Sequence, residues 1–158
     1  MPLSPDWDRF LDAMDPEKFR AAFRRESRIA MQAVGRECVR EAKRLIRSRA
    51  YAKNADSTIK RKGSSTPLVD NNDLVNSIRS VVQEDAAGMV AVIGANRRSD
   101  TGANIAAILH AGVPGNGPSG WRIPPRPFLR RAAQSSVVAD KLKEKAKEAA
   151  KKAMGVRS

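Results

Sequence analysis

The segment Ile123-Pro124-Pro125-Arg126-Pro127-Phe128-Leu129-Arg130 decides how this chain passes into its C-terminal part. Its three prolines lack an amide donor and fix φ, so the segment can continue neither a helix nor a central strand. We therefore expect a rigid extended crossing along a sheet edge, with Phe128 and Leu129 buried against a long N-terminal helix. On residue chemistry alone, the segment is equally consistent with a proline-rich linker before a terminal helix.

Helix signals occupy the N-terminal part of the chain. Ser4-Pro5 and Asp15-Pro16-Glu17 each place a capping residue before a proline at the first helical position. The first signal predicts a short helix with Trp7, Phe10 and Leu11 on one face. The second predicts a long helix from about Asp15 to Arg49. Its apolar stripe consists of Phe19, Phe23, Ala30, Val34, Cys38, Leu45 and Ile46.

Two residues of this stripe, Phe19 and Phe23, could in principle stack with nucleic-acid bases. Because they lie four residues apart on an apolar stripe, we expect them in the core instead. Cys38 lies within the same helical run and is expected to be a half-buried, unreactive thiol, because no histidine is near it in the sequence to activate it.

The middle of the chain predicts a β-hairpin. Residues 78–82 and 89–93 are rich in β-branched side chains, and Gln83 to Gly88 are expected to form the loop between them. Before the hairpin, Asp73 is expected to cap a short turn. After it, Asn104 to Ala111 has helical spacing, and Trp121 to Ile123 can form a short third strand.

The C-terminal helix is expected from about Pro127 to Ala153. Its second half has Lys at almost every other position and mostly Ala as apolar content, so it should bury little surface. These elements predict one α+β domain over residues 1–158, with the two long helices packed on a small antiparallel sheet and long mobile loops. Its parts are the N-terminal helices (1–49), a loop (50–72), the hairpin, short helix and proline segment (73–131) and the basic helix (132–158).

The formal net charge of +13 indicates attraction to a polyanionic partner, whether nucleic acid, an acidic protein surface or anionic lipid. The charge is concentrated on the long N-terminal helix, in the triplet Lys60-Arg61-Lys62 and in the C-terminal lysines. Since it is spread over both ends of the chain, it favours general electrostatic attachment over the reading of a base sequence.

Catalytic motifs are missing from the sequence. His110 is the single histidine, no glycine-rich phosphate loop follows a strand, and no serine lies in a nucleophile elbow. We therefore expect no enzyme activity, no cofactor and no metal. His110 is expected near an edge, where it either forms a local hydrogen bond or lies at a subunit contact. The chain shows no signal-peptide pattern and no apolar run of membrane-spanning length, so we expect it to be made in the cytoplasm.

A second segment, Ser57-Thr58-Ile59-Lys60-Arg61-Lys62-Gly63-Ser64-Ser65-Thr66-Pro67-Leu68-Val69-Asp70, precedes Leu74 and Asn76-Ser77-Ile78. Together with the proline segment it resembles the tail-completion, or neck, proteins of tailed bacteriophages. That family reads approximately "T-I-x-R-K-G…P-L-x-D-T-G-x-L-x-x-S-I", then a His in a short helix, then "I-P-x-R-P-F-L". The resemblance covers Ser57 to Arg131, with the blocks in the same order and at the same spacing.

This sequence departs from the family pattern at two places. Asn71-Asn72 replace a Thr-Gly pair, which alters a turn that asparagine also accommodates because it tolerates the left-handed conformation. His110-Ala111-Gly112 replace a His-Glu-Phe-Gly run, so the acidic and aromatic positions are missing.

The resemblance implies a structural virion protein, assembled in the host cytoplasm and located at the phage neck or tail. Such subunits form a ring around the tail axis, commonly of six copies, and join the completed tail to the head connector. The implied partners are copies of the chain, connector or adaptor proteins and tail terminator or tube proteins, with transient contact to genomic DNA and no membrane. Candidate inter-subunit or partner contacts are Thr58, Ile59, Lys60, Arg61, Lys62, Asp70, His110, Arg126, Phe128, Lys141 and Lys145.

Two further expectations concern assembly. The loop from Lys53 to Thr66 should be mobile in the free subunit and ordered in the ring. The C-terminal lysines should meet mainly acidic protein, because strong phosphate contacts around a ring would oppose the passage of DNA. The alternative function is that of a small basic nucleic-acid-binding protein. Against this alternative, the sequence contains no recognisable nucleic-acid-binding module, and aromatic side chains that could stack on bases are scarce.

Overall fold

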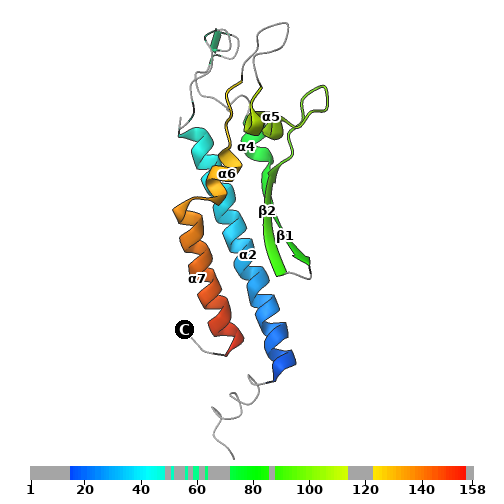
Figure 1. Cartoon of the computed structure of the whole chain (residues 1–158), viewed down its shortest axis with the longest axis vertical. Helices are drawn as coiled ribbons and strands as arrows, with labels where there is room; N and C mark the ends of the chain where they lie inside the picture. Colours follow the sequence, from blue (N-terminus) through cyan, green and yellow to red (C-terminus); the bar gives the residue numbers. More distant parts are fainter. Residues whose placement is uncertain are drawn as a thin grey trace, which may run out of the picture.

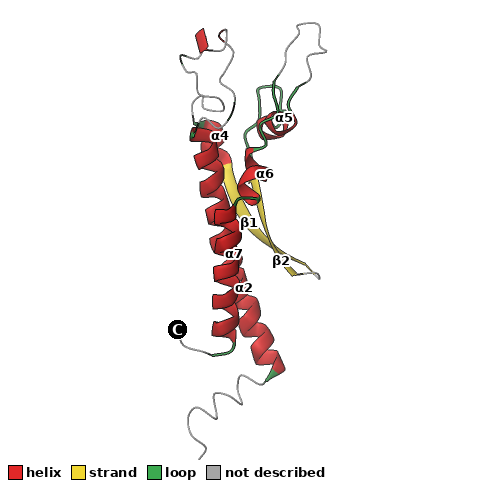
Figure 2. Ribbon diagram, turned by 60° about the vertical axis from the view of Figure 1, so that its left-hand side comes forward, coloured by secondary structure: helices red, strands yellow, loops and turns green. Residues whose placement is uncertain are grey.

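The computed structural model describes residues 15–48, 51, 56, 59–60, 63, 72–85, 88–113 and 123–155. Two long helices, α2 (Pro16–Arg47) and α7 (Ser136–Ala153), run antiparallel to each other, and a β-hairpin lies along α2 (Figures 1 and 2). The hairpin consists of β1 (Ile78–Asp85) and β2 (Gly88–Ala95). The predicted α+β class, with long N-terminal and C-terminal helices and a small antiparallel sheet, is confirmed.

Helix α2 is the central element, because the hairpin, α6 (Phe128–Ala133) and α7 all pack against it. It begins where the sequence predicts. The Asp15 side chain accepts hydrogen bonds from the amides of Glu17 and Lys18 at 2.9 and 3.2 Å, and Pro16 occupies the first helical position. The expected first helix around Trp7 lies outside the described residues.

The core lies at the end of the molecule where α2 terminates. Its largest fully buried side chains are those of Phe128, Ile46, Ile78, Val75 and Cys38. The expected burial of Phe128 against the long helix is therefore confirmed, with Leu129 half-buried beside it. Cys38 is fully buried, not half-buried as expected, and burial raises the pKa of its thiol, which keeps the thiol protonated and inert.

The expectation that Phe19 and Phe23 are core residues is wrong. Phe23 is 43% exposed and Phe19 is half-buried, while the two rings stack with centroids 5.9 Å apart. The hairpin ends beside Arg24 and Arg28, which donate hydrogen bonds to Glu84 near its tip. The first turns of α2 extend beyond it, so no sheet covers these rings (Figure 1).

The strands are longer than predicted. The ladder runs from Ile78 opposite Ala95 to Asp85 opposite Gly88, so Gln83, Glu84 and Asp85 belong to β1 and not to a loop. Only residues 86–87, which lie outside the described part, connect the strands. The ion pairs between Glu84 and two arginines of α2 explain why an acidic residue extends the strand.

Most of the expected third strand, Trp121 and Arg122, lies outside the described residues, and the sheet of the described residues has two strands. Ile123 pairs instead with Val113 in an isolated bridge, with N···O distances of 2.9 and 3.0 Å. The proline segment that follows does not run along the sheet edge. It leads from α5 (Ile105–Ala111) to α6, and the amide of Arg126 donates to the carbonyl of Leu109 at 2.7 Å.

The C-terminal helix is divided into α6 and α7, where the sequence predicts one continuous helix. The break lies at Gln134 and Ser135, and the Ser135 hydroxyl caps α7 by accepting from the amide of Val138 at 3.3 Å. Helix α7 nevertheless packs along α2 and buries Val138, Ala149 and Ala153. Among the described residues, none of the helices combines the length and apolar character that a membrane crossing requires.

Two short helices frame the hairpin. Helix α4 (Asp73–Ser77) precedes it and begins after Asn72, which has a left-handed φ of 59°. Asparagine thus accommodates the expected turn, although Asp73 is the first helical residue and not the cap. Helix α5 follows the hairpin as predicted, with the Asn104 side chain capping it at the amide of Ala107.

Candidate assembly surface

The outward face of the hairpin carries three exposed valines. Val81, Val90 and Val92 are 61%, 52% and 43% exposed, and Val81 lies directly opposite Val92 across the strands. Because side chains alternate along a strand, the three point away from α2. We call these three residues the valine face.

The sheet that carries the valine face is open at both edges. It has two strands, so the outer edge of each strand lacks a neighbouring strand within the described part of the chain. A two-stranded sheet is marginal by itself, and an apolar edge strand readily pairs with another chain. The hairpin therefore has the features of an association surface.

The inner face of the hairpin is held firmly on α2. Ile78 and Ile93 belong to or pack against the core, and Ser80 lies against the Cα of Gly35 on α2. At the far end, the ion pairs of Glu84 join the hairpin to α2. Anchored at both ends, the hairpin presents the valine face on a supported element.

A basic row runs along α2 on a different side. Arg36, Arg40, Lys43 and Arg47 follow one another at helical spacing, and the three arginines are exposed. Arg40 pairs with Glu37 at 2.8 Å. Gly35 faces the hairpin and Ala30 is buried, which leaves these four residues, the basic row, on the side of α2 turned to solvent.

The lysines predicted to meet a partner form ion pairs within α7. Lys141 donates to Glu144 at 2.9 and 3.0 Å, and Lys145 donates to Glu148 at 2.6 Å. The bond from Lys141, with a further contribution from Lys145, lowers the pKa of the Glu144 carboxyl, and the bond to Glu148 raises the pKa of the Lys145 ammonium. The charge of both lysines is thus partly balanced on their own helix, whereas Lys143 is more exposed and 3.9 Å from Asp140.

The predicted contacts around the proline segment differ in their exposure to solvent. His110 is exposed and lines a shallow depression of about 390 Å³ with Asn104 and Leu129. Phe128 and Arg126 are both buried in the subunit, and their expected role as contacts stays a prediction. Burial also lowers the pKa of the Arg126 guanidinium.

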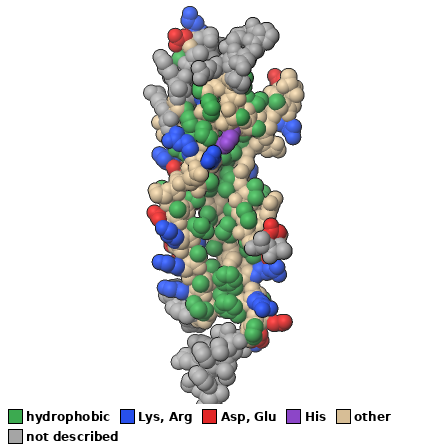
Figure 3. Space-filling model, viewed as in Figure 1, with side chains coloured by type: hydrophobic (Ala, Val, Ile, Leu, Met, Phe, Trp, Pro, Cys, Tyr) green, Lys and Arg blue, Asp and Glu red, His purple; other side chains and the backbone are tan. Residues whose placement is uncertain are grey.

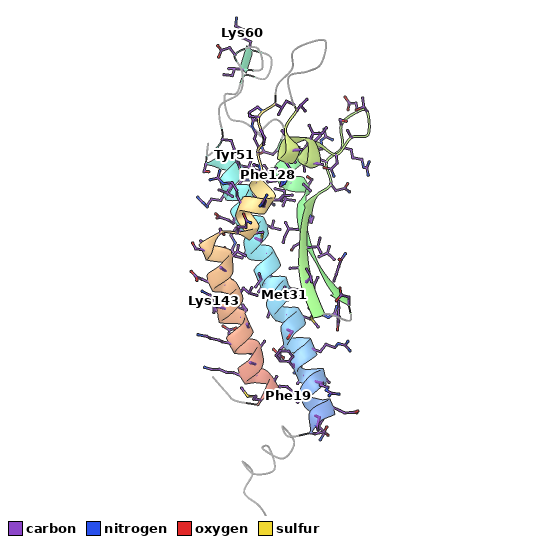
Figure 4. All side chains as sticks on the ribbon, in the orientation of Figure 1. Phe19, Met31, Tyr51, Lys60, Phe128 and Lys143 are labelled. Carbon is purple, nitrogen blue, oxygen red and sulfur yellow. The ribbon has the colours of Figure 1, made fainter. Side chains whose placement is uncertain are left out.

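Most of the predicted contacts in the upstream block lie outside the described residues, namely Thr58, Arg61, Lys62 and Asp70. Lys60 is exposed and Ile59 half-buried, and Figure 4 places Lys60 at the end of the molecule farthest from Phe19. The expected loop from Lys53 to Thr66 likewise lies mainly outside the described part.

Sequence reasoning did not identify the valine face. The signal was present, because Val81-Val82 and Val90-Ala91-Val92-Ile93 are apolar on both faces of their strands, a pattern typical of strands covered on both sides. In this subunit α2 covers one side only.

No group of three or more His, Cys, Asp or Glu side chains that could hold a metal ion occurs in the described part of the chain. Comparisons with protein-family models, with curated proteins and with solved structures found no match to this chain.

Proposed function

We propose that this chain is a structural subunit that assembles with copies of itself into a ring at the neck or tail top of a tailed bacteriophage. The ring completes the tail and joins it to the head connector. The sequence blocks between Ser57 and Arg131 support the phage role. The valine face on an open two-stranded sheet is the structural observation that supports assembly.

The physical argument for assembly is the cost of leaving this surface in water. Burying a valine side chain contributes about 1.5–3 kcal/mol, and the unpaired backbone groups of an edge strand gain hydrogen bonds from a neighbouring strand. A second copy supplies both an apolar face and strand edges of the same kind. The basic row points elsewhere, so repulsion between like charges does not oppose contact at the hairpin.

The self-assembly part is tested by the mass of the purified protein across a concentration series, measured by light scattering and native mass spectrometry. We expect an oligomer for the wild type and a monomer for the double variant Val81→Lys, Val92→Lys. Gln83→Lys is the matched control, because Gln83 is an exposed residue on the same side of β1 and gains the same charge without losing apolar surface. An oligomer that persists in the double variant contradicts assembly through this face.

The phage role is tested by joining heads to tails in an extract that lacks this protein. Wild-type protein should restore joined particles, and the double variant should not, whereas Gln83→Lys should behave as wild type. Unjoined particles after addition of wild-type protein would refute a role in joining, even if the protein forms rings.

The second candidate function, nucleic-acid binding, is favoured by the basic row. The four cations follow one another along about 16 Å of helix, so they form a line of positive charge that can contact several backbone phosphates. Affinity for duplex DNA should then fall steeply with salt, and Arg36→Gln, Arg40→Gln should reduce that slope. Gln substitutions at Lys143 and Lys147 on α7 control for the loss of net charge.

A further inference from the structure

A second apolar surface lies on the helices, apart from the valine face. Phe23 on α2 and Leu142 on α7 are 43% and 44% exposed, Ala146 on α7 is exposed, and Met31 on α2 is half-buried. We call these four residues the helical patch. Figure 3 shows hydrophobic side chains along the middle of the molecule, between α7 and the hairpin, with Lys and Arg at the margins.

The helical patch lies on one side of the α2–α7 pair, and an ion pair marks the other side. Glu26 on α2 and Lys152 on α7 are 4.0 Å apart. At about 100° per residue, Met31 lies about 140° around α2 from Glu26. Leu142 lies about 80° around α7 from Lys152, in the same sense, and in antiparallel helices both displacements lead to the same side. Gly35, one turn after Met31, faces the hairpin, so the patch lies on the hairpin side of the pair.

The hairpin lacks a cover that its sequence indicates. Its strands carry apolar side chains on both faces at residues 81–82 and 90–93, as strands between two helical layers do. Helix α2 supplies one of these layers, and the valine face remains exposed. The helical patch is an exposed apolar surface on two packed helices, so a second copy of the chain contains the missing layer.

The two surfaces also match in length and in charge. Each strand has 8 residues, about 26 Å, and α7 has 18 residues, about 27 Å. The outward side of β1 ends at the hairpin tip with the exposed Asp85, whereas the exposed Lys143 and Lys147 border the patch on α7. At the opposite end of this side of β1, the Arg79 guanidinium donates to the carbonyl of Ile78 at 2.9 Å. An acidic tip beside a basic margin adds electrostatic attraction to the apolar contact.

We propose that the valine face of one copy packs against the helical patch of the next copy. The two surfaces differ and lie on different sides of the subunit, so each copy meets one neighbour with each surface. Such head-to-tail contacts form a ring when the rotation between subunits closes, whereas contact between two valine faces produces only a dimer. This inference rests on the self-assembly proposed above, for which it names the second surface, and it does not depend on the phage role.

The experiment mixes two variants, each with one surface disrupted. Phe23→Lys, Leu142→Lys disrupts the helical patch, and Val81→Lys, Val92→Lys disrupts the valine face. At concentrations where the wild type is oligomeric, we expect native mass spectrometry to find each variant alone as a monomer. The equimolar mixture should form a dimer with one chain of each kind and no larger species, because it retains one valine face and one helical patch that can meet.

Matched controls are available on both helices. Ile29→Lys, Val137→Lys adds the same charge at apolar residues that are each 50% exposed, on other sides of α2 and α7, and this variant should assemble as the wild type does. Circular dichroism checks that each variant is folded. If a variant does not fold, cross-linking replaces it. Val90→Cys and Ala146→Cys in separate chains should then be joined by a short bismaleimide, because the buried Cys38 thiol does not react.

The outcomes separate this inference from the proposed self-assembly. The mixed dimer, or a cross-link that forms only between the two different cysteine variants, supports the contact. Oligomers of Phe23→Lys, Leu142→Lys alone, or cross-links of Val90→Cys with itself, show that the valine face meets another surface, and they overturn the inference while self-assembly stands. A mixture that stays monomeric also overturns it. A wild type that is monomeric at every concentration refutes self-assembly itself.

Discussion

Gly35 on α2 and Ser80 on β1 lie so close that a Cβ atom on Gly35 would be 2.9 Å from the Ser80 Oγ and 3.0 Å from its Cβ. This contact sets the distance between the central helix and the hairpin, because the missing side chain lets the strand approach the helix backbone. The hairpin that carries the valine face is therefore positioned by a glycine within a helix, where glycine is otherwise unfavourable.

Gly35→Val should lower the free energy of unfolding by about 1–3 kcal/mol, because the added side chain pushes β1 away from α2. Gly94→Val provides the control, since Gly94 lies on β2 with open space around its Cα, and valine favours strands. Urea unfolding of both variants checks the prediction. Equal stability of Gly35→Val and wild type would show that the spacing of helix and hairpin is adjustable.

Phe128→Ala should cost about 3–5 kcal/mol of stability, because the ring is fully buried among residues of α2 and α4. The same truncation at Phe23, which is well exposed, should cost far less. Thermal and urea unfolding measure both. A stable, fully folded Phe128→Ala protein would contradict the central place of this ring in the core.

Glu41 should make the stability of the protein depend on pH. The Arg44 guanidinium donates to its carboxylate at 2.6 and 2.7 Å, which holds the pKa of Glu41 below its ordinary value of 4.5. The folded state therefore binds this proton less tightly than the unfolded state, so the stabilisation is present above pH 4.5 and disappears as the pH falls through the lowered pKa.

The measurement compares wild type with Glu41→Gln by urea unfolding at several pH values. Their difference in free energy of unfolding should be largest near neutral pH and should shrink below pH 4.5. Glu37→Gln, on the same helix, corrects for the loss of one negative charge. A difference that is constant down to pH 3 would show that the ion pair does not act through the charge of Glu41.

Ser135→Ala should destabilise the protein by about 1 kcal/mol, because α7 loses the hydroxyl that caps the amide of Val138. Ser136→Ala, one residue later and exposed, should be close to neutral. Thermal unfolding compares the two variants. Equal effects at both serines would argue that the break between α6 and α7 is maintained by packing and not by this cap.

Local signals in the sequence predicted most elements correctly. Asp15-Pro16 marks the start of α2, Asn104 marks the start of α5, and β-branched residues mark both strands. These signals act within a few residues, through capping hydrogen bonds, restricted φ angles and side-chain crowding. They can therefore be recognised in the sequence before the fold is known. The break at Ser135 is also a local signal, because serine is a preferred helix cap, but the prediction of one continuous helix overlooked it.

The sequence by itself determined the α+β class, the order of the elements and the apolar stripe of α2. Only the tertiary structure decided which apolar residues are covered. Phe23 and Phe128 are the same side chain, yet one is exposed and the other is fully buried, because α2 extends past the hairpin at one end and meets α6 at the other. Val81 and Val92 likewise fit a covered strand and remain open to solvent. Burial depends on where the neighbouring elements end, which is a property of the assembled fold and not of any short stretch of sequence.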